Sequence, residues 1–79
     1  MKKEEVIMKI KMNGEDYIHP DEDCTLSQVL IVYLSREDIE QVRGIAVAMN
    51  GSLVRKTDWR STLVEEGDEI EVLTATQGG

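Results

Sequence analysis

The chain has 79 residues and a formal net charge of −7, from 16 acidic and 9 basic residues. A chain of this length buries a smaller fraction of its surface than a larger one, so we expect a single domain over residues 1–79 with little room for an internal active site. The excess of acids argues against nucleic acid or an anionic membrane as a partner, because both require a basic face.

Two strands joined by a tight turn are predicted at the start of the chain. Residues 6–12 alternate with the period of a half-buried strand, with lysines at positions 9 and 11 on one face; the apolar residues of the other face are Val6, Met8, Ile10 and Met12. Asn13-Gly14 follows, and an Asn-Gly pair between extended runs is a strong hairpin signal because both positions need positive φ. A second strand is expected over about residues 15–19, ending at Pro20.

An amphipathic helix is predicted after an acidic loop at residues 21–23. Thr25 and Gln28 have the spacing of a capping box, in which each side chain satisfies a backbone N–H group of the other. Apolar residues then recur at helical spacing and form one face: Leu26, Val29, Leu30, Tyr33 and Leu34.

The middle of the chain predicts a second hairpin. Residues 35–43 are polar, and we expect a loop there with a short helical piece that Gly44 stops. The apolar run at residues 45–49 predicts a strand, and Asn50-Gly51 predicts the turn into a short strand that includes residues 53–54.

The last predicted strand covers residues 69–75, after a turn at residues 66–68. Trp59 and Leu63 are expected to be isolated apolar anchors in the polar loop before that turn, with Trp59 a core residue rather than a contact for a partner. A single helix must cover one face of a sheet to bury its apolar stripe. The element order therefore indicates an α+β β-grasp (ubiquitin-like) fold: a mixed sheet of four to five strands, with the first and last strands inside it.

Cys24 and His19 are the only cysteine and the only histidine, which excludes an internal disulfide. The sequence has no CxxC and no cysteine-histidine set with metal-ligand spacing, so we predict no catalytic residue and no metal site. The sequence shows neither an export signal nor a transmembrane run, and together with a free thiol this favours the reducing cytoplasm.

Residues 76–79 are expected to form a flexible tail that ends in Gly78-Gly79. Glycine has no side chain, so such a tail can enter a narrow channel in another protein. The carboxylate of Gly79 is a poor electrophile, but adenylation by a partner would convert it into a mixed anhydride that sulfur or nitrogen can attack. This chemistry requires no catalytic residue in the chain itself.

Residues from about Met8 to Gly79 resemble the ThiS family of sulfur carriers in thiazole (thiamine) biosynthesis. The pieces that carry the resemblance, in this order and spacing, are Asn13-Gly14, Thr25-Leu26, residues 46–51 (AVAMNG), residues 55–59, residues 67–72 (GDEIEV) and residues 77–79 (QGG). The chain departs from the family pattern in a longer leader, Met1–Glu5, and in a longer connection, Ser35–Gly44, which puts partner preference in doubt more than the chemistry.

The resemblance implies a protein co-substrate rather than an enzyme, with no bound cofactor and a monomeric free state. A ThiF-like enzyme that uses ATP and magnesium would adenylate Gly79, and sulfur from a desulfurase system would convert it into a thiocarboxylate. The thiocarboxylate would then donate sulfur to a thiazole synthase. Gly78 and Gln77 would thread the tail into both enzymes.

Other functions share the same activation chemistry. The small subunit of molybdopterin synthase commonly has prolines before its diglycine, whereas the only proline here is Pro20. A carrier for tRNA thiolation or cysteine synthesis, a protein modifier that forms isopeptide bonds, and an interaction domain with an incidental tail all remain open.

The outer face of the sheet is predicted to dock the activating enzyme. If one face of the first and last strands packs against the helix, the residues between them point to the other, outer face. Four of these outward residues form an apolar patch that Glu69 and Glu71 border: Leu73, Ile7, Ala46 and Ala48. The acids near the C-terminus are either a solvated surface or a docking face for a basic partner: Glu65, Glu66, Asp68, Glu69 and Glu71.

Overall fold

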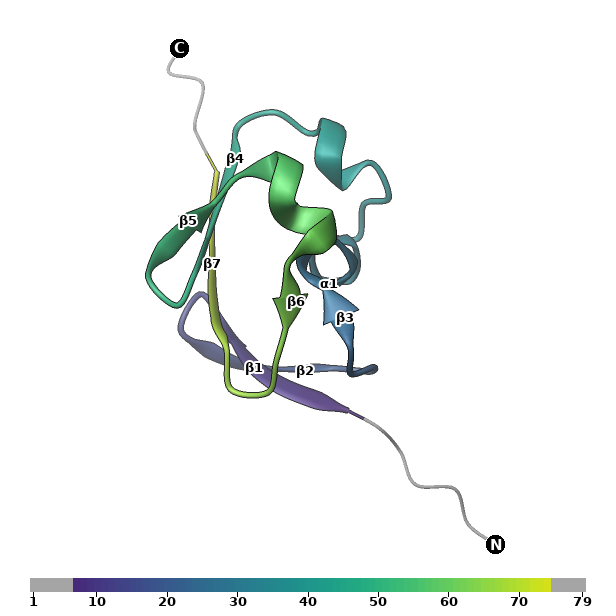
Figure 1. The fold of residues 1–79 in the computed structure, drawn as a ribbon, viewed down its shortest axis with the longest axis vertical. Coiled ribbons are helices and arrows are strands. Elements are labelled where there is room, and N and C mark those ends of the chain that lie inside the picture. The colour runs from purple at the N-terminus through teal and green to yellow at the C-terminus, as the bar shows by residue number, and fades with distance from the viewer. Residues whose placement is uncertain (1–6, 75–79) are drawn as a thin grey trace, which may run out of the picture.

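The computed structural model describes residues 7–74 and consists of a mixed five-stranded sheet with one main helix across it (Figure 1). The strand order is β2-β1-β7-β4-β5. These strands are β1 Met8–Met12, β2 Glu15–His19, β4 Ile45–Met49, β5 Ser52–Val54 and β7 Glu69–Thr74. The other elements are α1 Leu26–Leu34, two 3₁₀ helices, η1 Ile39–Gln41 and η2 Lys56–Ser61, and the two-stranded ribbon of β3 Cys24–Thr25 and β6 Leu63–Val64.

The two strands predicted to be internal, β1 and β7, are neighbours inside the sheet. They run parallel, with Lys11 opposite Glu69 and Met12 opposite Ile70. The pairs β1-β2, β4-β7 and β4-β5 are antiparallel. The α+β class and the number of strands in the main sheet are as predicted, and β7 is its middle strand.

Both predicted hairpin turns are confirmed. Asn13 and Gly14 have φ of 54° and 83°, and Asn50 and Gly51 have φ of 52° and 88°. Asn13 also anchors its turn to the centre of the sheet, because its Oδ1 accepts a hydrogen bond from the Val72 N–H at 2.7 Å. The first turn therefore holds β1 and β7 together as well as reversing the chain.

The capping box at the start of α1 is confirmed. The Thr25 N–H donates to Gln28 Oε1 at 2.8 Å, and the Gln28 N–H donates to Thr25 Oγ1 at 3.3 Å. The predicted apolar face lies against the sheet: Leu26, Val29 and Leu30 are fully buried, and Tyr33 and Leu34 pack at its edge. Helix and sheet thus share one hydrophobic core.

Trp59 is part of this core, as predicted, although the segment that carries it was expected to be a loop. Its side chain is 1% exposed on η2, and its Nε1 donates to the Val54 carbonyl at 3.0 Å. The prediction that Leu63 is also an anchor is wrong, because Leu63 is 61% exposed. In the short strand β6 its neighbour Val64 takes the inward position, and alternation leaves Leu63 outside.

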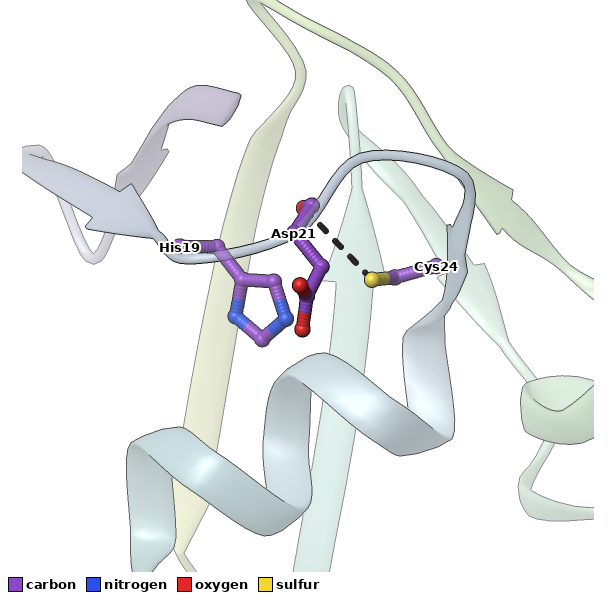
Figure 2. Close-up of side chains that lie close together, drawn as sticks. All are labelled: His19, Asp21 and Cys24. Carbon is purple, nitrogen blue, oxygen red and sulfur yellow. Dashed lines mark hydrogen bonds between the residues drawn. The ribbon is translucent and has the colours of Figure 1, made fainter. Parts of the chain in front are cut away.

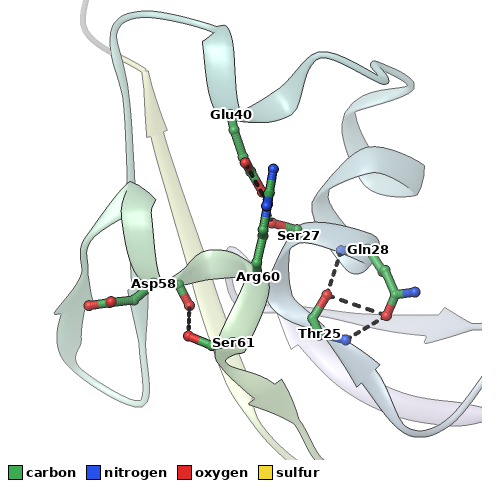
Figure 3. Close-up of polar contacts among 7 residues, drawn as sticks. All are labelled: Thr25, Ser27, Gln28, Glu40, Asp58, Arg60 and Ser61. Carbon is green, nitrogen blue, oxygen red and sulfur yellow. Dashed lines mark hydrogen bonds and ion pairs between the residues drawn. The ribbon is translucent and has the colours of Figure 1, made fainter.

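A polar network joins η1, α1 and η2 (Figure 3). Glu40 accepts a hydrogen bond from the Ser27 hydroxyl at 2.9 Å and from Arg60 Nε at 2.9 Å. The Ser27 hydroxyl, followed by Arg60, holds the pKa of Glu40 below its usual value. These contacts hold the two 3₁₀ helices against the main helix. The sequence had predicted only one short helical piece, in residues 35–43.

Candidate functional site

The tail residues predicted to carry the chemistry, Gln77, Gly78 and Gly79, lie outside the described residues. The strand that precedes them is described up to Thr74, which is exposed. Because β7 is the central strand, between β1 and β4, its last described residues lie at one end of the sheet, in the middle of its width. The candidate functional surface therefore consists of the residues around Leu73 and Thr74.

That surface contains part of the predicted docking patch. Leu73 is 55% exposed on the outer face of β7 and lies opposite Ala46 of β4, which is also exposed. The two residues line a shallow hollow together with Gly44, Ile45 and Thr74. On the next strand, Leu53 of β5 is a further exposed apolar residue.

Ala48 points to the same face as Ala46, but it is only 8% exposed and adds little to the surface. It lies between Leu53 on one side and Glu71 on the other. The larger neighbouring side chains leave a small alanine side chain little access to solvent. The prediction that Ala48 contributes to the exposed patch is therefore wrong.

Ile7 is exposed, but the structure separates it from Leu73. Parallel pairing puts Lys11 opposite Glu69; Ile7 is four residues before Lys11, whereas Leu73 is four residues after Glu69. The two offsets point in opposite directions and add up to eight residues, which corresponds to roughly 26 Å along the strands at about 3.3 Å per residue. The prediction of one patch that includes Ile7 is wrong, because Ile7 is at the opposite end of the sheet.

Four of the five acids near the C-terminus fall into two groups. Asp68 and Glu66 have structural partners: Asp68 accepts hydrogen bonds from the Glu65 N–H at 2.7 Å and from Asn50 Nδ2 at 3.0 Å, and Glu66 accepts from the Lys9 N–H at 2.9 Å. Glu69 and Glu71 are exposed on the outer face of β7, in line with Leu73. Only this second group adjoins the apolar residues, as predicted. We call Ala46, Leu53, Leu73, Glu69 and Glu71 the outer-face patch.

The loop between β2 and β3 brings together His19, Asp21 and Cys24, which the sequence had not indicated as a set (Figure 2). One potential ligand atom from each side chain lies within 4.8 Å of the others. Burial raises the pKa of the Cys24 thiol, with further contributions from Asp21 and Asp23, so the thiol is protonated near neutral pH. A buried, protonated thiol is a weak nucleophile. This cluster is also at the opposite end of the sheet from Leu73, because His19 lies opposite Met8.

A comparison with protein-family models matches residues 6–79 to the ThiS family. The chain belongs to the ThiS family. Membership supports, in general terms, a sulfur carrier in thiamine biosynthesis, and such carriers are small proteins rather than catalysts.

The chain is also similar to a solved structure, the thiamine biosynthesis protein (ThiS) from Geobacter metallireducens. The two have a TM-score of 0.71 and 23% sequence identity, over 91% of this chain and 100% of that chain. This likeness confirms the predicted β-grasp fold. A search of curated proteins gave no match. Within residues 7–74, no helix is long and apolar enough to cross a membrane.

Proposed function

We propose that this ThiS-family chain carries sulfur on the backbone carboxylate of Gly79. A ThiF-like enzyme would use ATP and magnesium to join this carboxylate to AMP, with release of pyrophosphate. Sulfide, released from the persulfide of a desulfurase system by a thiol reductant, would then attack the carbonyl carbon, displace AMP and leave a thiocarboxylate. The final step would be donation of this sulfur to a thiazole synthase.

The observation that carries the proposal is the family match, which extends through the diglycine at residues 78–79. The fold is consistent with it, since the middle strand of the sheet leads to these residues. A thioacid is more acidic than a thiol, so a thiocarboxylate would be ionised and nucleophilic near neutral pH. The chain would therefore serve as a substrate for two enzymes and would need no catalytic group of its own.

The test is the intact mass of the purified chain after incubation with a ThiF-like enzyme, ATP, magnesium and a desulfurase system. We expect the mass increase of one oxygen-to-sulfur exchange, located at Gly79 by fragmentation. Omission of ATP is the control and should leave the mass unchanged. A chain that forms neither an adenylate nor a thiocarboxylate would contradict the proposed function, and a lysine conjugate instead would favour a protein modifier.

We further propose that the outer-face patch docks the activating enzyme. In its exposed apolar centre, Leu73 is on β7, the strand that leads to the tail, and Ala46 lies opposite it on β4. Its acids, Glu69 and Glu71, would pair with basic residues of the partner, and such charge complementarity steers association. Contacts on this face would place the residues after Thr74 close to the active site of the enzyme.

Leu73→Glu is expected to slow adenylation by about tenfold or more, because it replaces an apolar contact at the centre of the patch with a third acid. The measurement is ATP–pyrophosphate exchange at limiting concentrations of the carrier. Leu63→Glu is a matched control, since Leu63 is similarly exposed, at 61% against 55% for Leu73, but lies on the separate β3-β6 ribbon. Equal rates for the two variants would exclude docking through this face.

A further inference from the structure

We propose that His19, Asp21 and Cys24 bind a zinc ion at the β2–β3 loop. The three side chains supply an imidazole nitrogen, a carboxylate oxygen and a sulfur, which are the three ligand types that zinc accepts in proteins. One such atom from each lies within 4.8 Å of the others. In Figure 2 the imidazole ring and the carboxylate lie side by side, and the sulfur points towards them from the start of β3.

The His19 side chain is buried, and one of its two ring nitrogens lacks a hydrogen-bond partner. His19 is 2% exposed, and its Nδ1 is the single buried side-chain nitrogen or oxygen within residues 7–74 that lacks a hydrogen-bond partner. Buried polar atoms normally have a partner, because leaving them without one costs free energy. In Figure 2 the other ring nitrogen, Nε2, faces Asp21, so Nε2 is the nitrogen that would bind the metal.

The spacing of the three ligands is close to what zinc requires. Zinc bonds of about 2.0 Å to nitrogen or oxygen and 2.3 Å to sulfur place tetrahedral ligands roughly 3.3 to 3.6 Å apart. The ligand atoms now lie within 4.8 Å of one another, so the longest of these distances must shorten by about an ångström or slightly more when zinc binds. Asp21 is exposed and lies in the loop, so its side chain is free to move towards the two buried ligands.

Binding would exchange a proton for the metal. Zn²⁺ would bond to the Cys24 sulfur as the S–H bond breaks and its proton is released to solvent, with no change in oxidation state. The thiol now has weak hydrogen bonds to the carbonyls of Asp21 and Glu22, at 3.5 and 3.6 Å, which the metal bond would replace. Three protein ligands leave the fourth position to water.

The place of this cluster in the fold indicates what the ion would do. The cluster joins the end of β2 to the start of β3, directly before the capping box of α1. It is at the end of the sheet opposite Leu73 and so is remote from the strand that leads to the tail. Zinc here would stabilise the fold, since metal binding to the native state shifts the folding equilibrium, and would take no part in sulfur transfer.

The test is titration of the untagged, metal-free chain with Zn²⁺ by calorimetry and with Co²⁺ by absorption spectroscopy. We expect a sulfur-to-cobalt charge-transfer band and a zinc-dependent rise in the melting temperature. Cys24→Ser should remove the band and, like Asp21→Asn, weaken zinc binding about tenfold or more. Glu22→Gln is the matched control, because it removes the same charge from the same loop but is not a member of the cluster.

If Glu22→Gln and Asp21→Asn lowered the affinity for zinc equally, the ion would be attracted by the overall charge of the acidic loop and not bound by the cluster. This result would overturn the proposal. Absence of the charge-transfer band in the unchanged chain would also overturn it, whatever its affinity for zinc. Because the readouts are binding, absorption and melting, they do not depend on whether Gly79 accepts sulfur. Failure of the zinc site and failure of the proposed function are therefore distinguishable.

Discussion

Addition of one alanine after Gly79 is expected to abolish thiocarboxylate formation. The added residue turns the Gly79 carboxylate into an amide, which cannot be adenylated. The new carboxylate is about 3.3 Å further along the chain and follows a residue with a side chain. Displacement of a reacting group by about 1 Å can cost roughly 100-fold in rate, so we expect a loss of at least this size. The measurement is the rate of thiocarboxylate formation by intact mass.

An alanine added before Met1 is the control for this variant, and it should accept sulfur at the rate of the unchanged chain. Neither extension touches residues 7–74, which contain the buried core, so both chains should have the same melting temperature. If the C-terminally extended chain were adenylated at the normal rate, the terminal carboxylate of Gly79 would not be the reacting group.

The parts of the fold that the sequence predicted well are those fixed by neighbouring residues. Alternation of Met8, Ile10 and Met12 with lysines depends on the two-residue period of a strand, and the buried pattern follows it. The capping box depends on the spacing of Thr25 and Gln28 alone. For these two elements the structure adds only which other elements they pack against.

The features that the sequence missed depend on distant pairings. The ribbon of β3 and β6 has two residues in each strand, which is too short to show any period, and its pairing joins Cys24 to Val64. The distance between Ile7 and Leu73 follows from the parallel register of β1 and β7, which no residue spacing reveals. The outward direction of both side chains was predictable, whereas their separation was not.

The same limit applies to the two candidate sites. The tail was recognised because its chemistry needs only a terminal diglycine after a strand, which can be read directly from the sequence. The cluster of His19, Asp21 and Cys24 depends on how the loop bends, and Asp23 adopts a left-handed φ of 57° there. A bend of this kind brings Cys24 back towards His19, and residue spacing gave no sign of it.

Trp59→Ala is expected to lower the free energy of unfolding by about 3 to 5 kcal/mol, the usual range for removal of a buried large aromatic side chain. Trp59 is 1% exposed and belongs to the same core as the sheet and α1. Native domains are stable by only about 0.05 to 0.15 kcal/mol per residue, so this loss would remove about a quarter or more of the stability of a chain of 79 residues. The measurement is urea unfolding followed by circular dichroism.

Two further variants separate the packing of Trp59 from any role in partner binding. Leu63→Ala should change stability by no more than about 0.5 kcal/mol, because Leu63 is exposed.

Trp59→Phe keeps an aromatic ring but loses the donor to the Val54 carbonyl, so it should be less destabilising than Trp59→Ala. Trp59 is buried in the core and is not part of the exposed outer-face patch, so the folded Trp59→Phe chain should be adenylated at the normal rate. If the Trp59→Phe chain were fully folded but adenylated more slowly than the unchanged chain, η2 would contribute to docking.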